Sequence, residues 1–195
     1  MLTLTARKNL ILKVTKQQSD ILIGCILGDA YITKSGKIQI EQSDKQIDYV
    51  NWKYNQLEKI CYGLPKKVIR YDKRYNKNYI SYRFWTRQFF RNWRKRFYLE
   101  NKKIFPLESI SPLTLAVWYM DDGCLNENKR IILSTDNFNE EDRTKIKNLF
   151  KKDFDIDVSY KNKGKMIIGT NESKKFFKII NPYTIPSMKY KILTP

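Results

Sequence analysis

The sequence predicts an α+β fold made of two similar halves, each in the order helix–strand–strand–helix–strand–strand–helix. The first observation is an internal repeat: when the chain is displaced by 93 residues, Leu22 falls on Leu115 and Asp29 falls on Asp122. The second is that segments with helical spacing of apolar residues alternate with segments of period two. The third is the composition, which is 42% hydrophobic with 10 Phe, 13 Tyr and 4 Trp, so that a chain of 195 residues can bury a full core. Repeats at a fixed offset indicate duplicated structural units.

The first helix of each half is predicted over residues 19–29 and 112–122, because both segments are almost entirely apolar. Ser111 is placed to cap the second of these helices, and Pro112 suits its first helical position. Helices as apolar as these are buried, and small residues such as Gly28 permit them to pack closely against each other.

A strand pair is predicted after each of these helices. In the first half Ile38 and Ile40 alternate with polar residues beyond a Ser-Gly turn at 35–36, a dipeptide that suits a tight hairpin. Residues 131–133 carry the corresponding pattern in the second half. Period two with one apolar face predicts half-buried antiparallel strands.

An amphipathic helix is predicted next in each half. In the first half its apolar residues step by three and four until Gly63, which is placed to end the helix. In the second half it is predicted near 140–154, with acidic residues at its start, where the helix dipole favours them. The apolar positions of the first of these helices are Ile47, Val50, Tyr54, Leu57 and Cys61.

A second hairpin and a last aromatic helix are predicted to close each half. Residues 1–19 contain four basic residues and no acid, which favours a basic arm that contacts phosphate over an organelle-targeting segment. The predicted hairpins are 67–72 with 79–86 and 157–162 with 165–170, and the predicted helices are 87–98 and 171–181. The predicted domains are a basic N-terminal arm over 1–16, a first half over 17–110 and a second half over 111–195.

The charge of the chain predicts a polyanionic partner. There are 38 Lys and Arg against 20 Asp and Glu, a net charge of +18, which is far more than solubility requires and indicates nucleic acid. The absence of histidine excludes histidine-based triads, nucleophiles and zinc sites. Cys25, Cys61 and Cys124 make no disulfide framework and predict a reduced, intracellular protein. No apolar run is long enough for a bilayer, and the Lys-, Asn-, Ile- and Tyr-rich composition suits the AT-rich genome of an organelle or a low-GC bacterium.

Each of the two apolar helices runs into an aspartate, Asp29 or Asp122. If the helices pack about a pseudo-twofold axis, both carboxylates emerge together. Carboxylates repel DNA phosphates, so in a strongly basic chain they indicate divalent cations held against two scissile phosphates. Oxygen ligands without His or Cys select hard ions such as Mg²⁺. A single aspartate after a helix commonly does no more than end it, but its recurrence at the equivalent repeat position favours the metal site.

The segments that carry these acids form a recognisable pair. Leu22–Ala30 reads LIGCILGDA and Leu115–Gly123 reads LAVWYMDDG. They resemble the paired signature of single-chain LAGLIDADG homing endonucleases, and the resemblance covers residues 17–195. The chain departs from the family pattern at Ala30 and Val117, where glycine is usual, which bears on the packing of the helices and not on the acids.

The resemblance implies a monomer whose antiparallel sheets form a saddle over the major groove of double-stranded DNA, with the signature helices at the interface of the halves. It implies that Asp29 and Asp122 share two or three Mg²⁺ ions, for which Mn²⁺ substitutes. The backbone carbonyls of Gly28 and Asp121 complete this expected metal site.

Three further residues are assigned by the resemblance. Lys103 and Lys191 are expected near the cleaved phosphates, where a lysine stabilises the extra negative charge or polarises the attacking water. The alternative for each lysine is an ordinary solvated surface charge. Gln42 matches a position that orders the water near the metal, and its repeat counterpart is Thr135.

The expected DNA-facing residues are the polar members of the alternating strands. Arg and Gln read base edges, whereas lysines more often position the backbone. In the first half these residues are Tyr31, Thr33, Lys37, Gln39, Glu41, Arg70, Asp72, Ser81 and Arg83, and in the second half they are Arg130, Ser134, Ser159, Lys161 and Lys165.

Together these features predict a nucleic-acid-binding protein with a metal-dependent cleavage site. The resemblance implies a site-specific DNA endonuclease that makes a double-strand break in a long asymmetric target and leaves short 3′ overhangs. Two alternatives stay open: a maturase that assists its host intron RNA, alone or besides cleavage, and a DNA-binding regulator without catalysis. Both acids and both lysines are present, which favours the nuclease. No splicing-domain residues accompany the two signatures, which predicts a free-standing enzyme.

Overall fold

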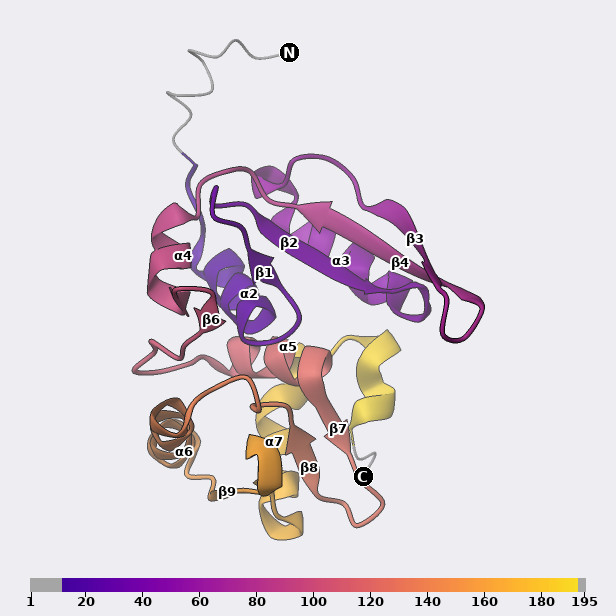
Figure 1. Cartoon of the computed structure of the whole chain (residues 1–195). Coiled ribbons are helices and arrows are strands. Elements are labelled where there is room, and N and C mark those ends of the chain that lie inside the picture. Colours follow the sequence, from indigo (N-terminus) through magenta and orange to yellow (C-terminus); the bar gives the residue numbers. More distant parts are fainter. Residues whose placement is uncertain (1–11, 193–195) are drawn as a thin grey trace.

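The structure, a computed structural model, describes residues 12–192 as two halves that meet along a pair of central helices (Figure 1). Of the predicted N-terminal arm over 1–16, residues 1–11 lie outside the described part. The elements of the first half are α2 (Lys16–Leu27), β1 (Tyr31–Ile32), β2 (Ile38–Ser43), α3 (Ile47–Leu57), β3 (Lys66–Asp72), β4 (Lys77–Trp85) and α4 (Arg91–Phe97).

The second half repeats this order of helices and strands, so the predicted α+β class and the predicted duplication are confirmed. Its elements are α5 (Pro112–Asp122), β7 (Gly123–Leu125), β8 (Ile131–Leu133), α6 (Glu140–Phe154), β9 (Val158–Tyr160), β10 (Met166–Ile168) and α7 (Thr170–Ile180).

Short elements connect these larger ones. A two-stranded antiparallel ribbon, β5 (Tyr98–Leu99) with β6 (Lys102–Lys103), lies between α4 and α5. The 3₁₀ helices are η1 (Asp44–Gln46), η2 (Glu58–Ile60), η3 (Asn162–Gly164), η4 (Asn181–Tyr183) and η5 (Pro186–Lys191).

Each half contains one four-stranded antiparallel sheet. The strand orders β1-β2-β4-β3 and β7-β8-β10-β9 are equivalent, as duplication requires. The sheets differ in size, because β3 and β4 have 7 and 9 residues whereas β9 and β10 have 3 each. The first half therefore presents the longer strand surface.

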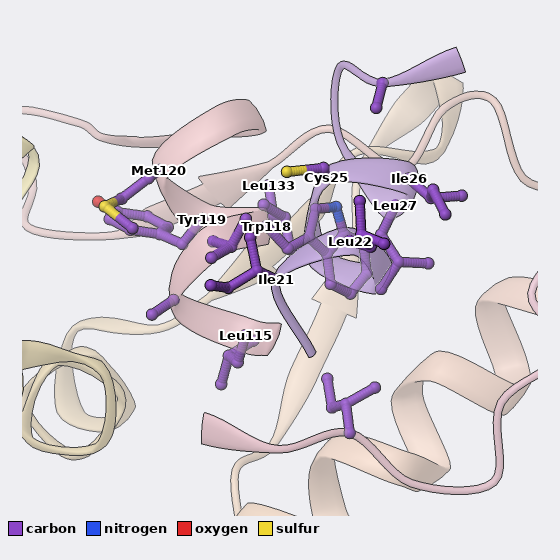
Figure 2. Packing of buried hydrophobic residues seen from close by; sticks show 14 of the residues in the cluster. Ile21, Leu22, Cys25, Ile26, Leu27, Leu115, Trp118, Tyr119, Met120 and Leu133 are labelled. Atoms are coloured by element: carbon purple, nitrogen blue, oxygen red, sulfur yellow. The ribbon is translucent and has the colours of Figure 1, made fainter. Parts of the chain in front are cut away.

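The helices α2 and α5 pack against each other at the junction of the halves. A Cβ atom at Gly24 would lie 2.6 Å from Cβ of Val117 and 2.7 Å from the carbonyl oxygen of Thr114. The departure from the family pattern at Val117 therefore leaves the close approach intact, because the partner position is a glycine. Around this contact Trp118 and Tyr119 are fully buried, and α2 and α5 together contribute much of the apolar core (Figure 2).

Several predicted boundaries need correction. α2 begins at Lys16 instead of 19, because Thr15 and Gln18 form a reciprocal capping box, and it ends at Leu27, so that Asp29 lies in the turn beyond it. α3 ends at Leu57 instead of running towards Gly63, because a 3₁₀ turn follows it. α4 is also shorter than the predicted 87–98. Ser111 and Pro112 do begin α5, where the serine side chain accepts from the Thr114 amide.

None of the helices within residues 12–192 combines the length and the apolar character that crossing a membrane requires.

Candidate active site

The two predicted acids lie at the carboxyl ends of α2 and α5. Asp29 is exposed in the turn after α2, and Asp122 is the partly buried last residue of α5. Burial raises the pKa of the Asp122 carboxyl to about 7, with further contributions from the carboxylates of Asp29 and Asp121. Because α2 and α5 pack against each other, the two carboxylates follow neighbouring helix ends, and a cation between them would offset their mutual repulsion.

The two predicted lysines reach the same place from opposite halves. Lys103, on β6, donates from Nζ to the carbonyl oxygen of Gly28 at 2.6 Å. Lys191, at the end of η5, donates to the carbonyl oxygens of Met120 at 2.7 Å and Asp121 at 3.3 Å. Each ammonium thus lies at the carboxyl end of a signature helix, where the helix dipole favours positive charge.

Partial burial changes the proton affinity of both lysines. Burial lowers the pKa of Lys103 and of Lys191 below the ordinary value of a lysine, although the neighbouring aspartates act in the opposite direction. They are therefore not simply solvated surface charges. Their placement on the two sides of the acid pair follows the duplication.

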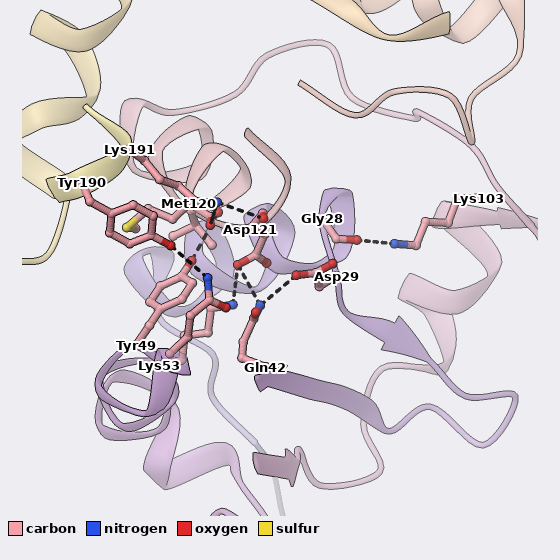
Figure 3. A network of polar contacts seen from close by, with 12 residues as sticks. Gly28, Asp29, Gln42, Tyr49, Lys53, Lys103, Met120, Asp121, Tyr190 and Lys191 are labelled. Atoms are coloured by element: carbon pink, nitrogen blue, oxygen red, sulfur yellow. Dashed lines mark hydrogen bonds and ion pairs between the residues drawn. The ribbon is translucent and has the colours of Figure 1, made fainter. Parts of the chain in front are cut away.

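Gln42, on β2, contacts one member of the acid pair, Asp29, and the neighbouring Asp121. Its side-chain amide donates to Oδ2 of Asp29 at 3.0 Å and to Oδ1 of Asp121 at 3.2 Å (Figure 3). Its repeat counterpart Thr135 is buried and donates instead to the carbonyl oxygen of Gly164. The glutamine contact therefore exists on one side only.

Two residues of this centre, Lys53 and Tyr49, are absent from the predicted set. Lys53, on α3, donates to Oδ1 of Asp121 at 2.6 Å, and both side chains are 0% exposed. Its ammonium also lies 4.1 Å from the centroid of the Tyr49 ring. Burial alone would lower the pKa of Lys53, but the Asp121 carboxylate outweighs that effect and raises it, while burial also raises the pKa of Asp121 itself. The sequence feature that could have indicated Lys53 is its helical spacing, because it lies four residues after Tyr49 and four before Leu57, on the buried face of α3.

The donors present fit a hard cation. No three side chains of Asp, Glu, His or Cys converge as a metal cage in the part of the chain that the structure describes. Mg²⁺ needs no such cage, because it is commonly bound by one or two carboxylates, water and substrate phosphates. The Oδ1 atom of Asp121 is already engaged by Lys53 and Gln42, and its Oδ2 atom is buried, which leaves Asp29 and Asp122 as the carboxylate donors. The carbonyl oxygens of Gly28 and Asp121 accept from lysines and retain a second lone pair each.

The predicted DNA-facing residues of the first half share one face of its sheet. The pairing places Gln39 opposite Trp85 and Glu41 opposite Arg83, while the intervening Ile40 is buried on the other face. The residues on this face, in phase with these, include Tyr31, Thr33, Lys37, Gln39, Glu41, Arg70, Asp72, Ser81 and Arg83, to which the structure adds Ser43, Lys66, Val68, Lys77, Tyr79 and Trp85.

Glu41 organises that face. Its carboxylate accepts hydrogen bonds from Arg70 and Ser81, and from Nε of Arg83 at 2.7 Å. Partial burial would raise its pKa, but these hydrogen bonds lower the pKa of Glu41 to about 2. Glu41 is therefore an anchor for two guanidinium groups and is not itself free to contact DNA.

The second sheet presents its predicted residues in the same way. Strands β8, β9 and β10 bury Ile131, Leu133, Val158, Met166 and Ile168 on one face. The residues in the opposite phase include the predicted Arg130, Ser134, Ser159, Lys161 and Lys165, and they also include the apolar Ile132 and Ile167.

A pair of carboxylates, flanked by a lysine from each half and by two sheet faces that carry arginines and lysines, defines a pseudo-symmetric nuclease. The family model described as the LAGLIDADG DNA endonuclease family matches residues 19–176, and the chain belongs to that family. The resemblance drawn from the two signatures is thereby confirmed.

Individual relatives agree with this assignment. The chain is 32% identical to "Probable intron-encoded endonuclease 1" of Wickerhamomyces canadensis, over 92% of this chain and 85% of that protein. It is 29% identical to "Cytochrome b mRNA maturase bI2" of Saccharomyces cerevisiae, over 88% of this chain but 46% of the maturase, so it spans about half of that relative. The solved structure of the homing endonuclease I-WcaI bound to its DNA recognition sequence superposes with a TM-score of 0.85 at 26% identity, covering 98% of this chain and 92% of that one.

Proposed function

We propose that this protein is a site-specific homing endonuclease that cuts both strands of a long asymmetric DNA target and leaves short 3′ overhangs. The observation that carries the proposal is the convergence of Asp29, Asp122, Lys103 and Lys191 at the ends of the paired helices. A merely DNA-binding protein has no use for paired carboxylates at this position, because they repel phosphate.

The reaction is hydrolysis of one phosphodiester in each strand. A water oxygen bonds to phosphorus, one backbone P–O bond breaks, and the leaving oxygen takes up a proton. When bound, Mg²⁺ held by Asp29 and Asp122 supplies a Lewis acid for the phosphate oxygens. Lys103 and Lys191 donate to the phosphate oxygens as negative charge accumulates, and their lowered pKa makes each a better proton carrier than an exposed lysine.

Target recognition is assigned to the exposed sheet faces of the two halves, 17–110 and 111–195. The net charge of +18 supplies affinity for the phosphate backbone, and the arginines and Gln39 supply contacts to base edges. Because the two sheets differ in length and in side chains, one polypeptide reads an asymmetric site as a monomer.

A second function is favoured by one observation, the similarity to the cytochrome b mRNA maturase over most of this chain. The same basic faces would then contact the host intron RNA. The two functions are compatible in one protein, and the cleavage experiment separates them.

We expect the protein in Mg²⁺ to cut a randomised duplex library at one enriched, long, asymmetric site with short 3′ ends, which sequencing of the ends would identify. The double variant Asp29→Asn/Asp122→Asn is the control and should yield no enriched ends. If folded wild-type protein yields none either, the nuclease proposal fails and intron RNA becomes the ligand to test.

We expect Glu41→Gln to reduce sequence discrimination. Without the carboxylate, Arg70 and Arg83 lose their anchor, so the preference for the target over a duplex with one base pair changed beneath the first half falls about tenfold. Competition binding in Ca²⁺ measures this ratio, and affinity for random DNA should not fall. Glu58→Gln, an exposed acid on the 3₁₀ helix η2, is the matched control. Unchanged discrimination in Glu41→Gln would remove the anchoring role.

A further inference from the structure

A buried chain of polar contacts runs beneath the acid pair. Lys53 donates to Asp121, Gln42 donates to the same carboxylate oxygen, and Gln42 also donates to Asp29 (Figure 3). The contacts lead from α3, through the last turn of α5, to the turn after α2. Within residues 12–192, Gln42 is the one side chain that donates a hydrogen bond to Asp29.

The second half does not repeat this chain of contacts. The repeat counterpart of Lys53 is Ile146, which is fully buried and apolar. The counterpart of Gln42 is Thr135, which is turned to Gly164. The two halves therefore differ at both donor positions.

The acceptor position differs as well, and the packing explains why. Asp121 and Gly28 are repeat counterparts that face each other across α2 and α5. A Cβ atom at Gly28 would lie 2.6 Å from Cβ of Asp121 and 2.9 Å from its Oδ2. Asp121 occupies the space that a side chain at Gly28 would need. Only one of these two repeat positions can therefore carry a buried acid.

A buried ion pair is in general weak evidence for added stability. Well-packed apolar side chains of similar volume often serve as well as a buried pair, whereas the pair fixes geometry. Here the fixed element is the Gln42 amide, which is bound on one side by an immobilised carboxylate and on the other by Asp29. The carboxylate of Asp122 accepts no side-chain hydrogen bond within the described range, and no equivalent device holds it.

We propose that Lys53 and Asp121 are positioning residues that hold the Gln42 amide against Asp29, so that one of the two cleavage-centre carboxylates is held in place and the other is free. This inference rests on the proposed nuclease function. The two strands of the target then depend unequally on the network, although the two halves share one topology.

The first test is strand-resolved cleavage by Gln42→Met, which removes the amide at nearly constant volume. Asp121 stays bound to Lys53 in this variant, so Asp29 alone loses its partner. Partners that orient a metal ligand are commonly worth about 10–100-fold in activity, so we expect one strand of the end-labelled target to be cut that much more slowly. The other strand should keep its rate within about twofold, and nicked duplex should accumulate. Thr135→Val, at the repeat counterpart, is the matched control and should leave the ratio of strand rates unchanged.

A double variant tests the role of the ion pair. In Lys53→Met/Asp121→Leu no buried charge is left alone, so folding is preserved, while Gln42 loses its anchor. We expect it to slow the same strand that Gln42→Met slows. Equal slowing of both strands, slowing of the opposite strand, or unchanged rates would overturn the proposal.

A measurement without cleavage separates this inference from the proposed function. In ¹⁵N-labelled protein the Gln42 side-chain amide should exchange its protons with solvent slowly, and at least tenfold faster in the double variant. Protection that is the same in both proteins would contradict the positioning role even if the enzyme cuts DNA. If the Gln42 amide loses its protection in the double variant as expected, but the wild-type protein cuts no duplex, the positioning role stands and the nuclease function is rejected.

Discussion

Asp29→Asn or Asp122→Asn alone should abolish double-strand cleavage, with the rate falling about a thousandfold or more, because the proposed role of each acid is to hold the metal, and removal of such a carboxylate costs several kcal/mol of transition-state stabilisation. Each amide keeps the shape of the acid but cannot supply an anionic oxygen. DNA binding in Ca²⁺ should persist, because the loss of a negative charge facing phosphate removes repulsion. Single-turnover cleavage of the labelled target, with binding measured beside it, gives both quantities.

The control for this experiment is Asp48→Asn, which changes an exposed acid in the first turn of α3, on the helix that covers the buried face of the sheet. It should cleave at the wild-type rate. Full double-strand cutting by both Asp29→Asn and Asp122→Asn would remove these residues from the metal site. Loss of binding together with cleavage would instead indicate that the acids maintain the fold at the junction of the halves.

The order of elements could be predicted because duplication is visible in the sequence itself. An offset of 93 residues aligns Asp29 with Asp122, and any element inferred in one half then has a counterpart in the other. Element ends were less predictable, because they depend on single capping contacts. Thr15 and Gln18 start α2 in a polar stretch that has no apolar periodicity.

The fold brings the predicted acids and lysines together. They could be predicted because each follows from the repeat or from the family resemblance. Lys53 could not be placed in the same way. The helical pattern was counted on apolar residues alone, and it assigned Tyr54 and Cys61 to the buried stripe of α3, whereas the buried positions are Tyr49, Val50, Lys53 and Leu57. A lysine is buried only with a charged partner, and that partner, Asp121, belongs to the other half. Local pattern carries no information on such a pair.

That pair provides a stability prediction of large size. Lys53→Met should lower the free energy of unfolding by about 3–5 kcal/mol, because it leaves the Asp121 carboxylate buried without a countercharge. The contact of the ammonium with the Tyr49 ring is lost at the same time. Urea unfolding followed by tryptophan fluorescence measures the change, provided that the dependence on urea concentration stays the same.

Two comparisons determine whether this loss comes from the unpaired charge. The double variant Lys53→Met/Asp121→Leu should recover most of the stability, since it replaces both partners by apolar side chains of similar volume. Lys16→Met removes a lysine that is 83% exposed and paired with Asp20 on the surface of α2, and it should cost less than about 1 kcal/mol. If the double variant is as unstable as Lys53→Met, the lysine contributes mainly through packing on α3. If Lys16→Met is equally destabilising, the loss of stability on removing a lysine does not depend on burial. The contact between Lys53 of the first half and Asp121 of the second would then have no special role in stability.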